Sequence, residues 1–591
     1  MAPCLMARKY KGLISMAKQL GSHDVSEHLR EAYARGWQED DVCFRFTSCT
    51  TPEGRPSVSV GCLPPALAVP IIFVPGIMGS NLKAKADISD GFGKAIIRSG
   101  APTWRVDSKE ELASEWVLRK KDQYQLRFQG DKVAVDDRGS IHVDASTNRT
   151  PISRQSEAQA RARGWGTVSA EFYGGFLDWL DNQLNGPGKL RVGGGLLDNT
   201  ALASLKQTAT KNPHGVAKDK PGATLGAVDL DILLKVDNPV HAFGYNWLQS
   251  NLESGAALSA FIDKTIAQYN KDGRICKRVI LVTHSMGGLV ARAACIVHGA
   301  TDKVAGVFHG VMPTDGAAAS YKSMVAGSGG EPWHGPGDWL GEWVGPKVLG
   351  PTGDYVTPAL AVNVGPLELL PNARYNQGKP WLRITDIDGK VIKELPKAGG
   401  DPYQEIYLEQ ACWWRLLNVE WLNPAGLNDT LLERYGKAID KASSFHMKVQ
   451  AAGDFHPNTH AHYGLDSDHL TYATVTWKLA KEVGAEQIDK LQRFHGAFPI
   501  NVAPKAGTRV LLLNDGLLIQ AQLSDPESAG DGVVPAHASA MSVDQGVKPG
   551  NLLVRGSGYI HNSSYSPKSR SEGPAAALQA IVRVLKAEVR A

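Results

Sequence analysis

The chain has 591 residues, of which 43% are hydrophobic and 21% are charged, and its formal net charge at pH 7 is +4. A net charge this small for the length indicates no nucleic-acid partner. No apolar stretch approaches the roughly 20 residues that cross a membrane, and the length fits several domains or one large core with insertions.

Residues 1–65 predict a helical amino-terminal extension without a targeting signal. Apolar residues repeat at helical spacing in two stretches, Leu13, Met16 and Leu20, and then Val25, Leu29 and Ala32. The first eleven residues carry charges, but no apolar run follows them. The sequence therefore predicts synthesis in the cytoplasm without a secretory signal peptide.

The cysteines are typical of free thiols in a reducing compartment. There are seven of them, scattered along the chain and without a C-x-x-C pair. Cys43, Cys49 and Cys62 lie close enough in the sequence to leave one bridge open as an alternative.

Residues 66–315 predict the first part of a core in which strands and helices alternate. Apolar runs typical of buried strands lie at 69–74, 240–245, 277–282 and 304–311. Stretches with helical spacing lie between them, at 256–270 and 287–298. This order favours right-handed crossovers and a doubly wound, mostly parallel sheet with helices on both faces. Residues from about 84 to 235 interrupt the order, and we expect them to form a loop-rich insertion.

Residues 316–440 predict a cap or lid inserted into this core, because they are rich in glycine, proline and tryptophan. Trp339 and Trp343 would share one face of a helix, which suits a membrane interface, while a role in the cap's own core is the alternative. Residues 441–591 predict the second part of the core. Its strands are expected at 443–449, 472–479, 509–513 and 552–555.

A hydrophobic, β-branched run stops at Ser285, and two glycines and a helix-compatible segment follow. This strand–turn–helix order is that of a nucleophile elbow. A serine hydroxyl becomes a good nucleophile beside a base, with backbone N–H groups directed at the same point. Gly287 provides the small residue that the turn needs, while Thr283 stands where glycine is commonest. The pattern predicts Ser285 as the catalytic nucleophile, and an incidental turn is the alternative.

Two segments downstream of Ser285 provide the acid and the base that a serine hydrolase needs. Asp531 lies between two glycines, and His561 lies between the strand expected at 552–555 and the final helix. The order serine, acid, histidine is that of doubly wound hydrolases. We therefore predict that His561 is the general base and then acid, and that Asp531 orients it. Asp466 and Asp468 are the alternative acids.

An oxyanion hole should combine two backbone N–H groups beside the nucleophile. We expect one from Met286, the residue after Ser285. We expect the other from Ile77, in the loop after the strand at 69–74.

Four histidines crowd one stretch, at His456, His460, His462 and His469. With Asp466 or Asp468 they could ligate zinc, and packing or hydrogen bonding is the alternative. The chain has no His-Glu-x-x-His and no cysteine near this stretch. The sequence therefore predicts no metal site and no other cofactor, and calcium is not indicated.

Residues 74–82, 284–288 and 530–535 resemble the motifs of α/β-hydrolase lipases. They are most similar to the lecithin:cholesterol acyltransferase-like and GPI inositol-deacylase-like branches, and residues 243–247 and 365–372 resemble the same group. Among these, the chain resembles the large bacterial type VI secretion lipase effectors, especially the branch with the GPI-deacylase-like segment.

This resemblance implies an α/β-hydrolase fold and a phospholipase, of type A1 or A2, acting on the membranes of rival cells. It also implies a cognate immunity protein, a type VI secretion spike component as a delivery partner, and export as a toxin to the membrane or periplasm of target cells. An acyltransferase or a deacylase of a glycolipid or GPI would use the same triad and is the second hypothesis. A hydrolase-fold binding protein that needs no turnover is the third.

Overall fold

The chain divides into two units, Met1–Ala66 and Leu67–Ala591. The computed structural model describes these residues: 33–34, 46–47, 66–108, 119–142, 156–185, 232–327, 350–427, 430–453, 455–493, 507–513, 516–538, 552–555, 560–567 and 573–590. In the first unit it describes one antiparallel pair, β1 (Tyr33–Ala34) with β2 (Phe46–Thr47). The helices predicted within residues 1–65 lie outside the described residues.

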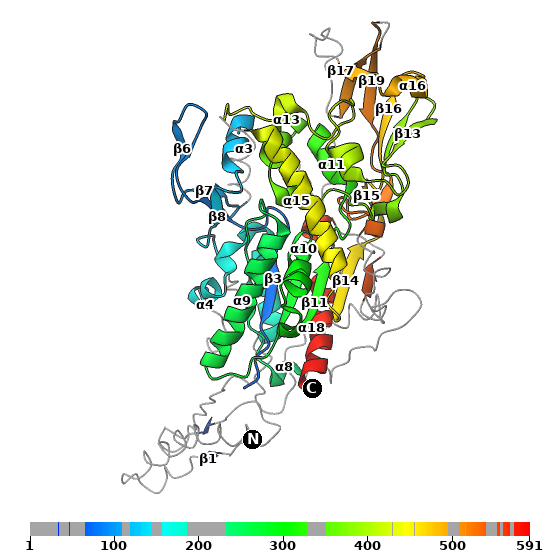
Figure 1. Ribbon diagram of the computed structural model, residues 1–591. Coiled ribbons are helices and arrows are strands. Elements are labelled where there is room, and N and C mark those ends of the chain that lie inside the picture. Colours follow the sequence, from blue (N-terminus) through cyan, green and yellow to red (C-terminus); the bar gives the residue numbers. More distant parts are fainter. Residues whose placement is uncertain are drawn as a thin grey trace. The chain divides into compact units, whose positions relative to one another are not determined.

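The core of the second unit is a six-stranded sheet in which all neighbouring strands are parallel (Figure 1). Its order is β21-β14-β11-β10-β3-β9. The strands are β3 (Ile71–Val74), β9 (Val240–Ala242), β10 (Val279–His284), β11 (Val304–Gly310), β14 (Thr459–Gly464) and β21 (Leu552–Arg555). The mostly parallel sheet predicted from the alternating pattern is confirmed.

Alternate residues of the central strands pack into two separate hydrophobic layers. Ile72 and Val74 of β3 belong to the cluster that includes α9 (Asn251–Lys271) and α10 (Gly287–Arg292). Ile71 and Phe73 belong to the cluster that includes α5 (Gly175–Asn185) and α18 (Gly573–Arg590). Because side chains of a strand point alternately to opposite faces, a continuous apolar run fits a strand covered on both sides. The sheet is therefore doubly wound.

The insertion between β3 and β9 contains more regular structure than the expected loop-rich segment. One antiparallel sheet has the order β7-β4-β8, and a hairpin pairs β5 with β6. The elements are β4 (Leu82–Ala84), β5 (Ile88–Ser89), β6 (Ala95–Ile97), β7 (Pro102–Trp104), α3 (Lys121–Arg127), β8 (Val133–Val135), α4 (Glu157–Ala162), α5 and α8 (Ile232–Lys235).

A second six-stranded sheet has the order β13-β12-β16-β19-β18-β17. Its strands are β12 (Leu382–Thr385), β13 (Val391–Leu395), β16 (Val475–Leu479), β17 (Gln492–Arg493), β18 (Thr508–Leu512) and β19 (Leu518–Leu523). It joins strands from the predicted cap at 316–440 with strands from the predicted core segment at 441–591. The second sheet therefore crosses the predicted boundary between residues 440 and 441. A strand pattern in the sequence indicates a strand, but it does not indicate which sheet that strand joins.

Residues 443–449, predicted to form a strand, lie within the long helix α15 (Leu431–Ala451). Tyr435, Ile439, Ala442 and Phe445 are buried along this helix at helical spacing, so the apolar residues follow a period of 3.6 over the longer window. The remaining described elements of this region are α11 (Ala318–Ala326), α13 (Gly353–Leu360), α14 (Val364–Leu367), β15 (Asp466–Thr471), α16 (Ala485–Ile488) and β20 (Ser528–Gly530).

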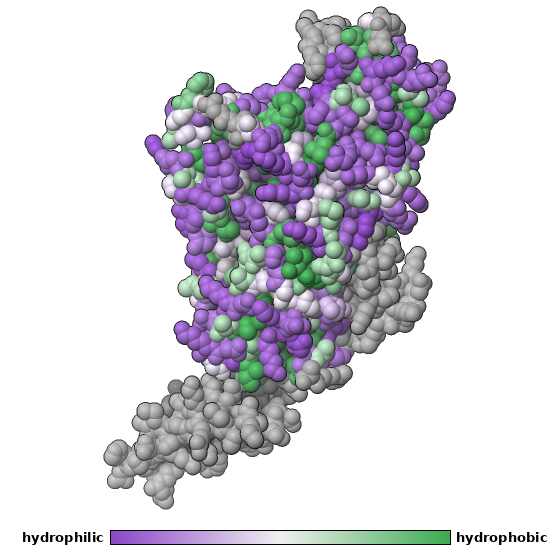
Figure 2. Space-filling model, in the orientation of Figure 1, coloured by the Kyte–Doolittle hydropathy of each residue, from purple (hydrophilic) through white to green (hydrophobic). Residues whose placement is uncertain are grey.

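The described tryptophans of the cap lie mostly in its interior. Trp381, Trp413 and Trp414 are buried in the large hydrophobic cluster, in agreement with the alternative that these residues form the cap's own core. Trp339 and Trp343 lie outside the described residues. Hydrophilic and hydrophobic residues are interspersed on the face shown in Figure 2. Of the helices that the structure describes, none has the length and apolar character needed to cross a membrane.

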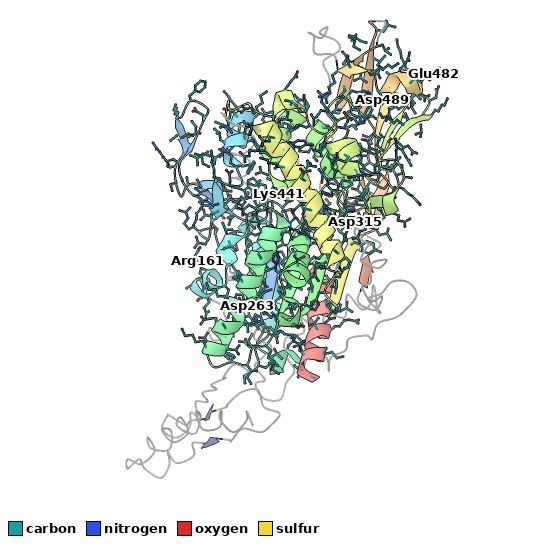
Figure 3. The ribbon with its side chains drawn as sticks, in the orientation of Figure 1. Arg161, Asp263, Asp315, Lys441, Glu482 and Asp489 are labelled. Atoms are coloured by element: carbon teal, nitrogen blue, oxygen red, sulfur yellow. The ribbon has the colours of Figure 1, made fainter. Side chains whose placement is uncertain are left out.

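Two buried acidic side chains fasten the 365–374 segment to the core. Glu368 accepts hydrogen bonds from the Ser250 hydroxyl (2.6 Å) and the Asn251 backbone N–H (2.7 Å) at the start of α9. Asp315, which follows β11 and is labelled in Figure 3, accepts a bond from the Asn372 amide (3.0 Å) and pairs with Arg374 (3.3 Å). Burial raises the pKa of Glu368 to about 8.

A Glu368→Gln variant is expected to gain stability over the wild type as the pH rises. Between about pH 4.5 and about pH 8, the unfolded chain loses the Glu368 proton while the folded protein retains it, so the free energy of unfolding falls with rising pH. Glutamine can accept the Asn251 N–H bond and does not ionise. Urea unfolding should be measured at about pH 5 and at about pH 8. The free energy of unfolding of the variant, relative to that of the wild type, should be larger at the higher pH.

The exposed Glu486, on the first turn of α16, provides the matched control, because it does not contribute to the pKa of Glu368. Glu486→Gln should follow the wild-type pH dependence. An unchanged difference between Glu368→Gln and the wild type at the two pH values would contradict the prediction.

Candidate active site

Ser285 lies on a strained turn between β10 and α10, with a left-handed φ of 50°. Such a conformation costs a non-glycine residue about 1–3 kcal/mol and is concentrated at functional sites. A Cβ at Gly287 would lie 2.4 Å from the Val74 carbonyl oxygen and 2.5 Å from that of Pro75. Backbone segments therefore touch at Gly287, and only glycine fits there.

The Thr283 side chain is accommodated in β10 by a hydrogen bond to the neighbouring strand β11. Its hydroxyl is hydrogen-bonded to Nδ1 of His309 (2.9 Å), the residue paired with it on β11. The departure from glycine at this position is therefore accommodated by a partner in the sheet.

The structure brings Ser285, His561 and Asp531 together. His561 Nε2 lies 2.9 Å from Ser285 Oγ, and His561 Nδ1 lies 2.9 Å from Asp531 Oδ2. Ser285 follows β10, His561 begins the helical turn after β21, and Asp531 follows β20. Ser285 is 4% exposed, His561 5% and Asp531 0%, so the three groups form a buried line of hydrogen bonds.

The Asp531 carboxylate is held on both of its oxygens. Oδ1 accepts bonds from the backbone N–H groups of Val533 (3.0 Å) and Val534 (2.7 Å), while Oδ2 faces His561. In addition, the His561 backbone N–H donates to the Asp531 carbonyl (2.8 Å). This geometry places an ionised carboxylate where it can stabilise a protonated imidazole.

The loop after β3 lies directly against Ser285. A Cβ at Gly76 would be 3.0 Å from Ser285 Cβ, and Ile77 follows Gly76 in this loop. Within the described part of the chain, the backbone N–H groups of Ile77 and Met286 donate to no protein acceptor. Both N–H groups are therefore available for a ligand beside Ser285.

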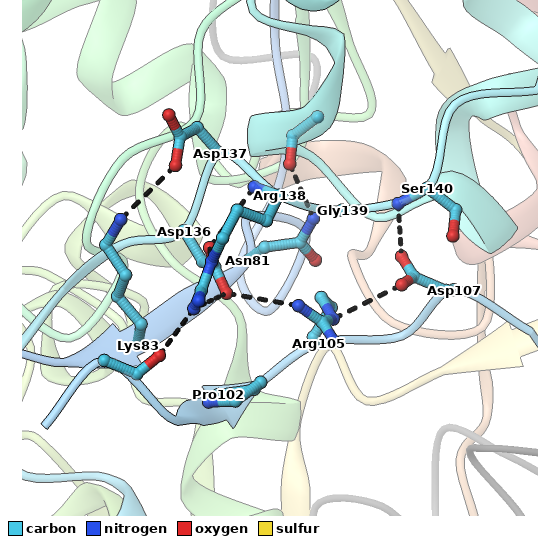
Figure 4. Close-up of polar contacts among 12 residues, drawn as sticks. Asn81, Lys83, Pro102, Arg105, Asp107, Asp136, Asp137, Arg138, Gly139 and Ser140 are labelled. Carbon is cyan, nitrogen blue, oxygen red and sulfur yellow. Dashed lines mark hydrogen bonds and ion pairs between the residues drawn. The ribbon is translucent and has the colours of Figure 1, made fainter. Parts of the chain in front are cut away.

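The insertion holds this loop in place through a polar network (Figure 4). The Asn81 side-chain amide donates to the carbonyls of Gly166 and Val168, each at 3.0 Å, and the Asn81 carbonyl accepts the Asp136 N–H (2.8 Å). The buried Asp136 accepts two bonds from Arg138 (2.7 and 3.0 Å). Burial opposes its ionisation, but the bonds from Arg138 lower the pKa of Asp136 below its usual range.

Comparison with known proteins finds a family model that matches the segment around Ser285. Residues 247–325, which contain Ser285, match the family model PGAP1, PGAP1-like alpha/beta domain. This part of the chain is therefore similar to a PGAP1-like alpha/beta domain. This domain covers α9, β10, α10 and β11, and the predicted α/β-hydrolase fold is confirmed.

Beyond the PGAP1-like domain, the similarity extends over most of the chain. A solved structure described as the crystal structure of the Tle4-Tli4 complex contains a chain with 27% sequence identity and a TM-score of 0.67. The match covers 88% of the present chain and 99% of that chain. No curated protein matches the present sequence.

The alternative acid Asp468 is exposed on β15, whereas Asp531 is the carboxylate that bonds to His561. Two further residues beside Ser285 were not singled out from the sequence, namely His284 and Tyr173. His284 directly precedes Ser285 in the chain, which is a usable signal. Tyr173 comes from the insertion, 111 residues before His284, and no sequence pattern marks it.

The histidines of the 456–469 stretch make hydrogen bonds and packing contacts within the protein. His456 Nε2 lies 3.0 Å from the Val304 carbonyl oxygen, and the His462 ring stacks on Phe308 at 5.3 Å. Burial lowers the pKa of His460 to about 3. Among the described residues, no three histidine, cysteine or acidic side chains gather as a metal site would require. Cys276, Cys295 and Cys412 are free thiols, and the other cysteines lie outside the described residues.

Proposed function

We propose that the protein is a serine lipase of the phospholipase A type, which hydrolyses ester bonds of membrane phospholipids. The observation that carries the proposal is the continuous line Ser285–His561–Asp531, with 2.9 Å at both contacts, on a strained elbow. The PGAP1-like domain and the similarity to the Tle4-Tli4 structure support a lipolytic enzyme.

In the proposed reaction, Ser285 Oγ attacks the ester carbonyl while His561 Nε2 accepts its proton. The oxyanion accepts hydrogen bonds from the N–H groups of Met286 and Ile77. His561 then donates the proton to the departing lysophospholipid oxygen, which leaves an acyl ester on Ser285. A water molecule, deprotonated by His561, then attacks the acyl carbonyl. The bond from the acyl group to Ser285 Oγ breaks, His561 returns the proton to Oγ, and the fatty acid leaves. Asp531 remains ionised throughout and stabilises the imidazolium.

We also propose a cognate protein partner and type VI secretion to target cells. The similar structure is described as a complex of Tle4 with Tli4, which supports a protein partner for this chain. The immunity role of that partner rests on the resemblance of the sequence. A spike component as the delivery partner rests on the resemblance of the sequence alone.

The decisive experiment measures fatty-acid release from vesicles whose phospholipid is labelled separately at sn-1 and at sn-2. Untreated protein should release label from one position, which assigns type A1 or A2. Protein treated with a serine-reactive alkyl phosphonate should release none, and mass spectrometry should locate the adduct on the peptide containing Ser285. Adduct formation without hydrolysis would contradict the phospholipase assignment and favour acyl transfer, which added alcohol acceptors would reveal.

A further inference from the structure

Three buried hydrogen bonds connect the loop after β3 to the backbone of His561. The Gly76 backbone N–H lies 3.2 Å from the Tyr173 hydroxyl, which lies 2.8 Å from His284 Nδ1. On the other side of its ring, His284 Nε2 lies 3.0 Å from the His561 carbonyl oxygen. These bonds join four segments that are remote in the sequence, and we call them the Tyr173–His284 bridge.

The direction of every bond in the bridge follows from its two ends. The His561 carbonyl can only accept, so His284 Nε2 carries a proton. Burial, with a further contribution from the nearby His561 ring, lowers the pKa of His284 to about 3, so the ring is neutral and Nδ1 accepts. The Tyr173 hydroxyl must then donate to Nδ1, and its oxygen accepts the Gly76 N–H. Burial also raises the pKa of Tyr173 above its ordinary value, which keeps this donor protonated.

Both ends of the bridge lie beside reacting groups. Gly76 precedes Ile77, whose N–H is the predicted oxyanion donor, and a Cβ at Gly76 would come within 2.9 Å of His284 Nδ1. The His561 backbone is held on both sides, since its N–H donates to Asp531 and its carbonyl accepts from His284. A displacement of about 1 Å in such groups can cost about 100-fold in rate.

We propose that Tyr173 and His284 are positioning residues, which hold the loop after β3 and the His561 imidazole in their places beside Ser285. This inference rests on the proposed serine hydrolysis. It gives the insertion a role in the reaction, because the insertion supplies Tyr173.

The bridge can be separated from simple packing. The Tyr173 ring packs against Phe73, with 5.0 Å between ring centroids, and Tyr173→Phe retains this ring while removing the hydroxyl. His284→Leu removes both bonds of the imidazole. His284→Gln offers an oxygen to Tyr173 and an N–H to the His561 carbonyl. It should therefore restore part of the activity that His284→Leu loses.

The experiment measures kcat and KM for a short soluble p-nitrophenyl ester, so that lipid access does not enter. Tyr173→Phe should lower kcat by about 10- to 100-fold and leave KM within about twofold. His284→Gln should retain more activity than His284→Leu. Because the bonds act as one unit, the double variant Tyr173→Phe/His284→Leu should be no more than about threefold slower than His284→Leu alone.

Tyr435→Phe is the matched control, because the Tyr435 hydroxyl is also buried and hydrogen-bonded, in its case to the Tyr407 carbonyl, but takes no part in the Tyr173–His284 bridge. It should leave kcat unchanged. Wild-type kcat in Tyr173→Phe, or losses that multiply in the double variant, would overturn the inference. If the wild type neither hydrolyses the ester nor reacts with an alkyl phosphonate at Ser285, the proposed function itself fails.

Discussion

Replacing Ser285 with alanine is expected to lower ester hydrolysis by about 10⁴- to 10⁶-fold. Alanine removes the oxygen that lies 2.9 Å from His561 Nε2 and leaves the base without a nucleophile to activate. The backbone at this position has a φ of 50°, which strains serine and alanine alike, so the fold should remain. Steady-state kinetics on a soluble ester and release of fatty acid from vesicles should both show the loss.

Ser320→Ala is a suitable control for this variant, because it also removes a hydrogen-bonded hydroxyl. The Ser320 hydroxyl donates to the Leu369 carbonyl and lies on α11, not on the elbow. Its activity should equal that of the wild type. If Ser285→Ala loses hydrolysis but still inhibits growth when directed into susceptible cells, the biological effect does not require turnover. The binding-protein hypothesis would then replace the enzymatic one.

An Asp531→Asn variant is expected to lose about 10⁴-fold in kcat, although the substitution changes almost no volume. Oδ1 of Asp531 accepts two backbone N–H bonds and Oδ2 accepts from His561, so neither position tolerates an NH₂ group. If the asparagine oxygen keeps the backbone bonds, its NH₂ faces His561 Nδ1. The imidazole must then carry its proton on Nε2, where it can no longer accept the proton of Ser285.

Asp468→Asn on β15 provides the control, because Asp468 was an alternative acid and is exposed. Its kcat should equal that of the wild type, and thermal unfolding should show Asp531→Asn still folded. A folded Asp531→Asn enzyme with nearly normal kcat would remove Asp531 from the reaction.

The elbow could be predicted from the sequence because its requirements are local. A buried strand, a turn that needs Gly287, and a helix follow one another within a few residues of Ser285. The partners Asp531 and His561 could be found because chain order and flanking elements restrict the candidates. Their contacts with one another and with Ser285 are properties of the three-dimensional structure, in which residues 276 positions apart come within hydrogen-bond distance.

The second sheet and the Tyr173–His284 bridge could not be predicted in the same way. The alternation of Val475, Trp477 and Leu479 indicates a strand, but its pairing with β12 depends on side chains about 90 residues away in the chain. Tyr173 is an aromatic residue within an apolar helical stretch, where a role in packing is the natural expectation. Only its hydroxyl contacts distinguish it from the neighbouring core residues.

The two large sheets are interleaved along the chain, since β11 is followed by β12 and β13, then by β14, then by β16 to β19, and finally by β21. Neither sheet can be completed until the polypeptide that forms the other has largely been made. While the chain is still emerging from the ribosome, Ser285 is present for nearly 300 residues of synthesis without His561. A nascent chain therefore carries the elbow without His561, so the proposed hydrolase activity would arise only late in synthesis.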